Sequence, residues 1–283
     1  EKNFIYQERA FPEAEYSFHH VLVRDAIYQA LPQPRRQAFH QRAGDALEQH
    51  YADNLAPYVE ELAYHYDQAA VADKAIFYLL QAGEKARRDY HNDAAATYFQ
   101  RALQRLEQLP TTPQAQAQQL AALTGLGQLA AVMSQFAAAE AYLRQAITLS
   151  QAIQAPAKAE AKLRAWLGDL LLNWQPRPAE ALAIAATGLA RLDADRESTE
   201  AAMLYGVIGW AHDLLGDLAS FRKTVAQVAG FLDHVPYAEE LRPTYGWLTM
   251  AYFRDKELEN ALVWMENAQR EALQYHDLRW YGE

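Results

Sequence analysis

The sequence contains no cysteine. This absence excludes a disulfide framework and thiolate chemistry, and it is typical of proteins in a reducing cytosol. The chain also has no signal peptide and no apolar run near the roughly 18 residues that a membrane-spanning helix requires. We therefore expect a cytoplasmic protein whose partners do not include a membrane.

The chain also has no excess of basic residues. It has 26 Lys and Arg against 36 Asp and Glu, a formal net charge of −10. An acidic chain has no electrostatic reason to bind nucleic acid, so we expect no nucleic-acid partner. The sequence starts at Glu1 rather than Met and stops at DLRWYGE, which leads us to expect an excised fragment of a longer protein.

Motifs that carry catalysis are missing as well. There is no GxxxxGK[ST] phosphate-binding loop, no HExxH zinc signature and no serine in a nucleophile elbow. The nine histidines are scattered, and the adjacent His19 and His20 diverge on a helix, which argues against a joint metal site. We predict that the chain is not an enzyme and carries no metal or cofactor of its own.

What the sequence does contain, from His20 onward, is helical periodicity. Apolar residues recur at spacings of three and four, β-branched runs are few, and prolines lie between the periodic segments. Only the preceding stretch, FIYQERAFPEAE, alternates like a short strand and then turns. The pattern predicts an all-α protein with a small β element at its N-terminus.

Four segments superpose, at residues 123–146, 164–188, 205–228 and 245–268. Small residues occupy equivalent places 41, 41 and 40 positions apart: Gly127, Gly168, Gly209 and Thr249. In three copies an apolar residue opens a second helix nine positions later: Phe136, Leu218 and Leu258. Alanines are expected to keep that helix thin where it packs: Ala139, Ala146, Ala261 and Ala268. The period of about 41 predicts tandem pairs of antiparallel helices, because a pair cannot bury its apolar face alone.

This pattern resembles the tetratricopeptide repeat, W-x2-L-G-x2-Y followed by A-x3-F-x2-A, with a longer period. The resemblance implies a right-handed superhelix of antiparallel helix pairs. Two departures are one extra residue near Gln175–Arg177 and Phe221 where Ala is usual. Residues 60–103 fit the same scheme less regularly, and the chain ends at Glu283 just as a further first helix should begin.

A second resemblance concerns the start of the chain, FIYQERAFPEAEYSFHHVLVRDAIYQAL, and the two helical stretches after it. This region is similar to the one that follows the ATPase module in bacterial STAND-type signalling proteins. Such proteins often carry a class III adenylate/guanylate cyclase domain. The resemblance implies the end of a winged-helix subdomain at 1–33, adjoining irregular repeats at 34–108 and tetratricopeptide-like repeats at 109–283. It also implies ATP or ADP in the parent protein, with His20 contacting the nucleotide phosphates. The alternative is that His20 is an ordinary helix-start residue.

If tetratricopeptide geometry holds, residues just after each small position line a concave groove. The predicted groove residues are Gln128, Asp169, Asn173, Trp210, Asp213, Met250, Phe253 and Arg254, together with Val132, Leu172 and Leu214. Exposed aromatic residues with a few charges suit a protein or peptide partner. The alternative is that Trp210 and Phe253 pack against the next repeat.

We therefore expect a non-catalytic sensor or scaffold arm that regulates an upstream nucleotide-binding module of the same chain. Two alternatives stay open: a stand-alone tetratricopeptide adaptor, and the sensor arm of a transcriptional regulator. Neither the ligand nor the oligomeric state follows from the sequence.

Overall fold

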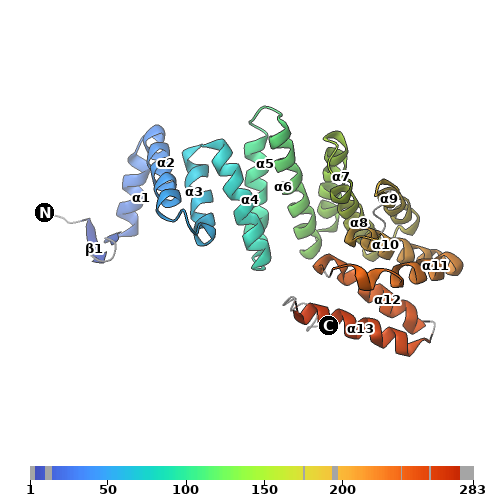
Figure 1. Ribbon diagram of the computed structural model, residues 1–283. Coiled ribbons are helices and arrows are strands. Elements are labelled where there is room, and N and C mark those ends of the chain that lie inside the picture. The colour runs from blue at the N-terminus through green and yellow to red at the C-terminus, as the bar shows by residue number, and fades with distance from the viewer. Residues whose placement is uncertain are drawn as a thin grey trace. The chain divides into compact units, whose positions relative to one another are not determined.

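The computed structural model describes residues 4–9, 15–174, 176–192, 197–236, 238–254 and 256–274. Along the chain these residues divide into two compact units, the first ending at Pro110 and the second beginning at Thr111. Figure 1 labels the helices of both units. The division comes two residues after the boundary expected at 108/109. The predictions for Gln175, for the side chain of Ala268 and for the terminal residues 279–283 concern positions outside the described residues.

The first unit opens with an antiparallel hairpin and continues as helices. Strands β1 (Ile5–Arg9) and β2 (Glu15–Phe18) pair with Ile5 opposite Phe18. The helices are α1 (Val21–Ala30), α2 (Gln33–His50), the 3-10 turn η1 (Ala56–Tyr58), α3 (Val59–Ala69), α4 (Ala72–Arg88) and α5 (Asn92–Leu106). Consecutive helices from α2 to α5 pack against one another.

The second unit consists of helices throughout its described residues. They are α6 (Pro113–Val132), α7 (Phe136–Ala152), α8 (Ala157–Asn173), α9 (Pro178–Arg191), α10 (Thr199–Leu215), α11 (Leu218–Ala229), the short η2 (Leu232–His234) and η3 (Glu239–Leu241), α12 (Arg242–Arg254) and α13 (Leu258–Gln274). Each helix packs against the helix that follows it in the sequence. In addition, α10 lies beside both α8 and α12. No helix in the described part of the chain combines the length and hydropathy needed to cross a bilayer.

The helix boundaries confirm the repeat prediction. Helices α7, α11 and α13 begin at Phe136, Leu218 and Leu258, the three residues predicted to open second helices. Ala139, Ala146 and Ala261 are buried, as a thin packing face requires. Phe221, the departure from the repeat pattern, is also buried and meets Trp247 edge to face, with ring centroids 5.8 Å apart.

The repeat pattern predicts that each small residue lies between the two helices of its own pair, and this holds at Gly127 but not at Gly168 or Gly209. Gly127 lies against Leu143 of the second helix of its own pair, as expected. A Cβ on Gly168 would instead lie 2.6 Å from Val207, and one on Gly209 would lie 2.0 Å from Trp247. Both neighbours belong to the first helix of the following pair. These glycines therefore bring α8, α10 and α12 together, because any side chain there would hold the helices apart.

Several turns between helices share one backbone conformation. A residue with positive φ follows six of the helices: Ala70, Tyr90, Ser134, Gln154, Gly216 and Lys256. The next amide closes the turn by bonding back to the last turn of the helix, as from Gln135 N to Ala130 O at 2.7 Å and from Asp217 N to His212 O at 3.0 Å. This is the Schellman geometry that ends a helix and satisfies its last carbonyls.

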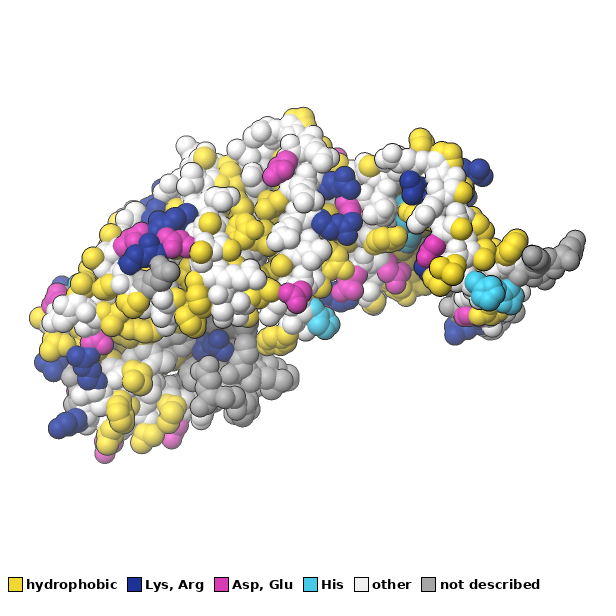
Figure 2. Space-filling model, turned by 180° about the vertical axis from the view of Figure 1, so that it is seen from behind, with side chains coloured by type: hydrophobic (Ala, Val, Ile, Leu, Met, Phe, Trp, Pro, Cys, Tyr) yellow, Lys and Arg dark blue, Asp and Glu magenta, His cyan; other side chains and the backbone are white. Residues whose placement is uncertain are grey.

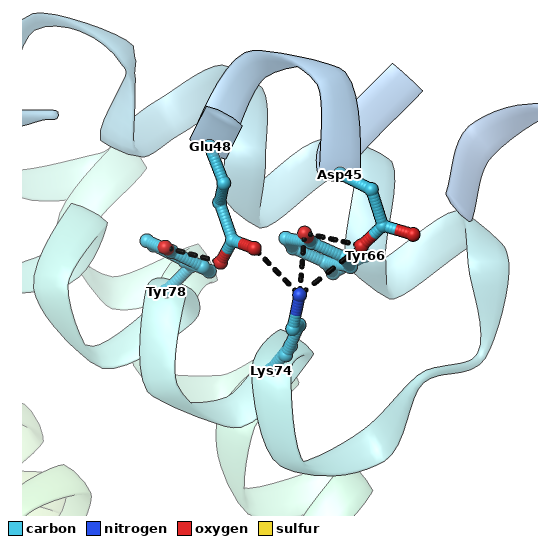
Figure 3. Close-up of polar contacts among 5 residues, drawn as sticks. All are labelled: Asp45, Glu48, Tyr66, Lys74 and Tyr78. Atoms are coloured by element: carbon cyan, nitrogen blue, oxygen red, sulfur yellow. Dashed lines mark hydrogen bonds and ion pairs between the residues drawn. The ribbon is translucent and has the colours of Figure 1, made fainter. Parts of the chain in front are cut away.

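A lysine-centred cluster ties α2, α3 and α4 together (Figure 3). Lys74 Nζ donates to Glu48 at 2.5 Å, to Asp45 at 3.1 Å and to the Tyr66 hydroxyl at 2.9 Å. The Tyr78 hydroxyl donates to the other Glu48 oxygen at 2.6 Å. Hydrogen bonds from Lys74 and Tyr66 lower the pKa of Asp45, and burial raises the pKa of Tyr78 to about 12. The cluster links α2, α3 and α4 and leaves the hydroxyls of Tyr66 and Tyr78 hydrogen-bonded.

Candidate functional site: the surface of the first helices in the second unit

The predicted groove residues lie on four helices of the second unit, and the glycine contacts explain their placement. Asp169 and Trp210 directly follow Gly168 and Gly209, which bring α8, α10 and α12 together. A side chain one position further around the helix therefore reaches the edge of that close contact. We call the predicted set, with Leu214, the inner-helix surface: Gln128, Asp169, Asn173, Trp210, Asp213, Leu214, Met250, Phe253 and Arg254.

Apolar members of this surface differ in exposure. Met250 and Phe253 on α12 are 66% and 61% exposed, and Leu214 at the end of α10 is 47% exposed. Trp210 is half-buried, and Gln128 on α6 is half-buried too. Val132 is exposed, whereas Leu172 is buried and contributes to the core rather than to the surface. Three of these four exposed apolar side chains therefore lie in the last turns of α10 and α12, and the fourth, Val132, is the last residue of α6.

The charged residues at this end neutralise each other. Arg254 forms an ion pair with the half-buried Asp213. The same guanidinium lies over the Phe221 ring, 5.7 Å from its centroid. A cation held by a carboxylate and an aromatic face is fixed in position. Arg254 therefore borders the apolar patch as an oriented group with a partner.

Asp169 differs because no cation within ion-pair distance balances it among the described residues. Its carboxylate accepts a hydrogen bond from Asn173 Nδ2 at 3.1 Å. Burial raises the pKa of Asp169 to about 6, although the Asn173 bond and the positive charge of Arg242 act in the opposite direction. A half-buried carboxyl with a strongly shifted pKa is a candidate for ligand contact.

Figure 2 shows one face of the molecule, with charges of both signs interspersed and apolar side chains reaching the surface in many places. It shows no continuous basic patch on this face. Among the residues that the structure describes, no group of three or more His, Asp or Glu side chains could hold a metal ion.

His20 lies in the first unit, away from these helices in sequence. It is the exposed residue that precedes α1, and its backbone carbonyl accepts from the amides of Val23 and Arg24 at 3.1 and 3.2 Å. His19 instead lies beside the Tyr6 ring, with centroids 4.6 Å apart.

Sequence reasoning missed a hydrogen-bonded chain of three residues in the first unit. The Tyr28 hydroxyl lies 2.8 Å from His40 Nε2, and His40 Nδ1 lies 2.9 Å from His65 Nδ1. Burial lowers the pKa of both histidines. The three residues come from α1, α2 and α3, so no sequence spacing links them.

Comparisons with known proteins identify the fold. No family model matches the chain. Of solved structures, BtubC (BKLC) from P. vanneervenii is similar at a TM-score of 0.55 and 15% identity, covering 87% of this chain and 93% of that one. The Rap conjugation regulator of plasmid pLS20, solved with the Phr* peptide, gives a TM-score of 0.59 at 15% identity over 77% of this chain and 57% of its own.

A third structure, a Rap protein complexed with Competence and Sporulation Factor, gives a TM-score of 0.58 at 12% identity, over 87% of this chain and 78% of that one. Identities this low establish the fold alone. The chain is a tetratricopeptide-like helical-repeat protein, as predicted.

One curated protein is similar in sequence. An uncharacterized protein of Rhizobium meliloti (strain 1021) is 28% identical over 129 residues, which is 45% of this chain. The matched part covers 12% of that relative, which is therefore much longer than this chain.

Proposed function

We propose that the chain is a non-catalytic adaptor that binds a protein or peptide on the inner-helix surface. The observation that carries the proposal is the exposed apolar patch of Met250, Phe253 and Leu214, bordered by the fixed Asp213–Arg254 pair. Exposed apolar groups beside oriented polar ones are typical of binding hot spots. Two of the similar structures contain a bound Phr* peptide or Competence and Sporulation Factor, which supports this kind of partner.

A selection from a random dodecapeptide library on the purified chain tests this function. Enriched peptides would be measured by isothermal titration calorimetry against the parent chain and against a Met250→Ala/Phe253→Ala variant. We expect the double substitution to weaken binding by at least 10-fold, because losing a buried apolar anchor costs about 2 kcal/mol or more.

The matched control is Phe77→Ala, which removes an aromatic side chain of comparable exposure from α4 in the first unit. It should leave peptide binding unchanged. A library without enriched sequences, or binders equally affected by both variants, would contradict the proposal.

A second proposal is that the chain serves as the sensor arm of an upstream nucleotide-binding module, with ATP or ADP bound there. It is favoured by α1, a ten-residue helix in which no residue is buried. Three apolar side chains of this helix are exposed: Val21, Leu22 and Ile27. An exposed apolar helix fits packing against a further domain. Ligand on the inner-helix surface would then shift that module between two states for which it has different affinity.

This second proposal is tested in the full-length parent protein by the release rate of a fluorescent ADP analogue. We expect His20→Ala to accelerate release, whereas His19→Ala, the adjacent control, should not. If the two variants release ADP at the parent rate, His20 has only its helix-start role.

A further inference from the structure

A small polar cavity opens between α3 and α5 in the first unit, outside the inner-helix surface. Its volume is about 150 Å³ and its lining residues are Asp67, Arg101, Gln104, Arg105 and Gln108. Ligand pockets for whole organic molecules usually measure roughly 300–1,000 Å³. The cavity therefore suits a single functional group rather than a nucleotide or a drug-sized ligand.

The lining of the cavity has a net charge of +1, from two arginines and one aspartate. Asp67 is buried, and its two carboxylate oxygens accept from Arg105 Nε at 2.6 Å and from Arg101. Arg105 also donates to the Asp67 backbone carbonyl at 3.0 Å. One arginine would balance the charge of Asp67, so the second leaves an excess of one positive charge.

The donors of this cavity also exceed its acceptors. A guanidinium has five N–H groups, and the bonds to Asp67 engage one on Arg101 and two on Arg105. The other N–H groups have no hydrogen-bond acceptor within the described chain. Both arginine side chains are half-buried, so the contacts to Asp67 hold the guanidinium planes in position. The side-chain amides of Gln104 and Gln108 add further donors at the rim.

We propose that this cavity binds an oxyanion group, a carboxylate or a phosphate. Fixed guanidiniums match the geometry of both groups and form charge-assisted hydrogen bonds with them. A cation is disfavoured, because the one carboxylate in the lining is already bound by two arginines. The site is independent of peptide binding on the second unit, and it gives the first unit a recognition role of its own.

The test is a titration of the isotopically labelled chain with inorganic phosphate and, separately, with acetate, followed by NMR. The reporters are the side-chain amides of Gln104 and Gln108 and the Nε–H of Arg101. Ionic strength is held constant with chloride, so that general screening is the same at every point. We expect saturable shifts at these reporters. Saturable shifts with phosphate alone would identify a phosphate site. Saturable shifts with both anions would identify a site that accepts either oxyanion.

Two variants separate recognition from folding. Arg101→Gln keeps the Arg105–Asp67 contact, and we expect it to weaken anion binding by roughly 10-fold. Gln104→Ala/Gln108→Ala leaves the arginines and Asp67 intact and should weaken binding less. Arg88→Gln, an exposed arginine on α4, is the matched charge control and should bind as the parent does. Shifts that do not saturate, or that a separate titration with sodium chloride reproduces, would overturn the proposal.

Discussion

At the scale of single residues, the polar side chains differ in how well they are compensated. Glu160 is buried, but Arg164 and Arg191 both bind it, at 2.7 and 3.1 Å. Asp169 is less buried and has only the Asn173 bond and the more distant charge of Arg242. A partly buried carboxylate without an ion-pair partner lowers the stability of the folded protein. Such groups are expected at functional surfaces, where residues are selected for binding rather than for stability.

Asp169→Asn should therefore stabilise the second unit at pH 7.5, by about 1–2 kcal/mol. Because the folded-state pKa is raised from 3.8 to about 6, the stabilising contribution of this group is full below pH 4 and is lost as the pH rises through 6. The variant should show little gain at pH 4. All six tryptophans lie in the second unit, so urea unfolding followed by tryptophan fluorescence reports on it.

The control for this measurement is Asp53→Asn, an exposed aspartate of the first unit. Its tryptophan-detected unfolding should match that of the parent at both pH values. An Asp169→Asn variant that is no more stable than the parent at pH 7.5 would show that Asp169 is compensated by other means.

At the scale of elements, the turns carry backbone strain that sequence could relieve. Ser134 has a φ of 59°, and Gly216 occupies the equivalent turn two repeats later with a φ of 77°. A residue with a side chain is less stable than glycine in this region of φ and ψ. The same position is thus filled by a strained residue in one repeat and by an unstrained one in another.

Ser134→Gly should stabilise the second unit by about 0.5–1 kcal/mol, and Gly216→Ala should destabilise it by about 1 kcal/mol. The two substitutions are opposite changes at equivalent positions, so each serves as the control for the other. Urea unfolding at pH 7.5 measures both. Changes of the same sign in the two variants would argue against backbone strain as the cause.

The Tyr28–His40–His65 chain makes the stability of the first unit depend on pH in the opposite direction to that of Asp169 in the second unit. Burial lowers the pKa of both histidines, with Arg36 adding to the effect at His40 and Glu61 opposing it at His65. The unfolded chain then binds protons more readily, so the stabilising contribution is lost as the pH falls below about 6.5. Two charged rings could not share the 2.9 Å contact.

His65→Gln should flatten the loss of first-unit stability between pH 7 and pH 5, because one of the two titrating rings is removed. Amide hydrogen exchange of α2 and α3 at the two pH values measures it. Tyr28→Phe is the companion variant: it removes the hydroxyl bond to His40 but keeps both rings, so the pH dependence should remain. If His65→Gln leaves the slope unchanged, titration of this pair does not control the stability of the unit.

At the scale of the whole molecule, periodic features were predictable and contacts between distant helices were not. The 41-residue spacing and the residues Phe136, Leu218 and Leu258 predicted where second helices begin, because small and apolar residues at fixed offsets carry that information. The sequence did not show that Gly168 and Gly209 pack against the next pair. Spacing within one helix gives the direction of a face but not the element that covers it.

The candidate sites follow the same division. Repeat geometry was enough to predict the exposed Met250 and Phe253. It was not enough for the Asp67 cavity or the histidine chain, whose members meet only through the packing of separate helices. The winged-helix resemblance and the role of His20 remain predictions.

The most direct test of the central proposal is hydrogen–deuterium exchange on the chain with and without a selected peptide. Binding to the inner-helix surface predicts slower exchange in α10 and α12, around Asp213 to Leu215 and Met250 to Arg254, with the first unit unchanged. Protection confined to the first unit, or protection of α11 and α13 without α10 and α12, would contradict the account.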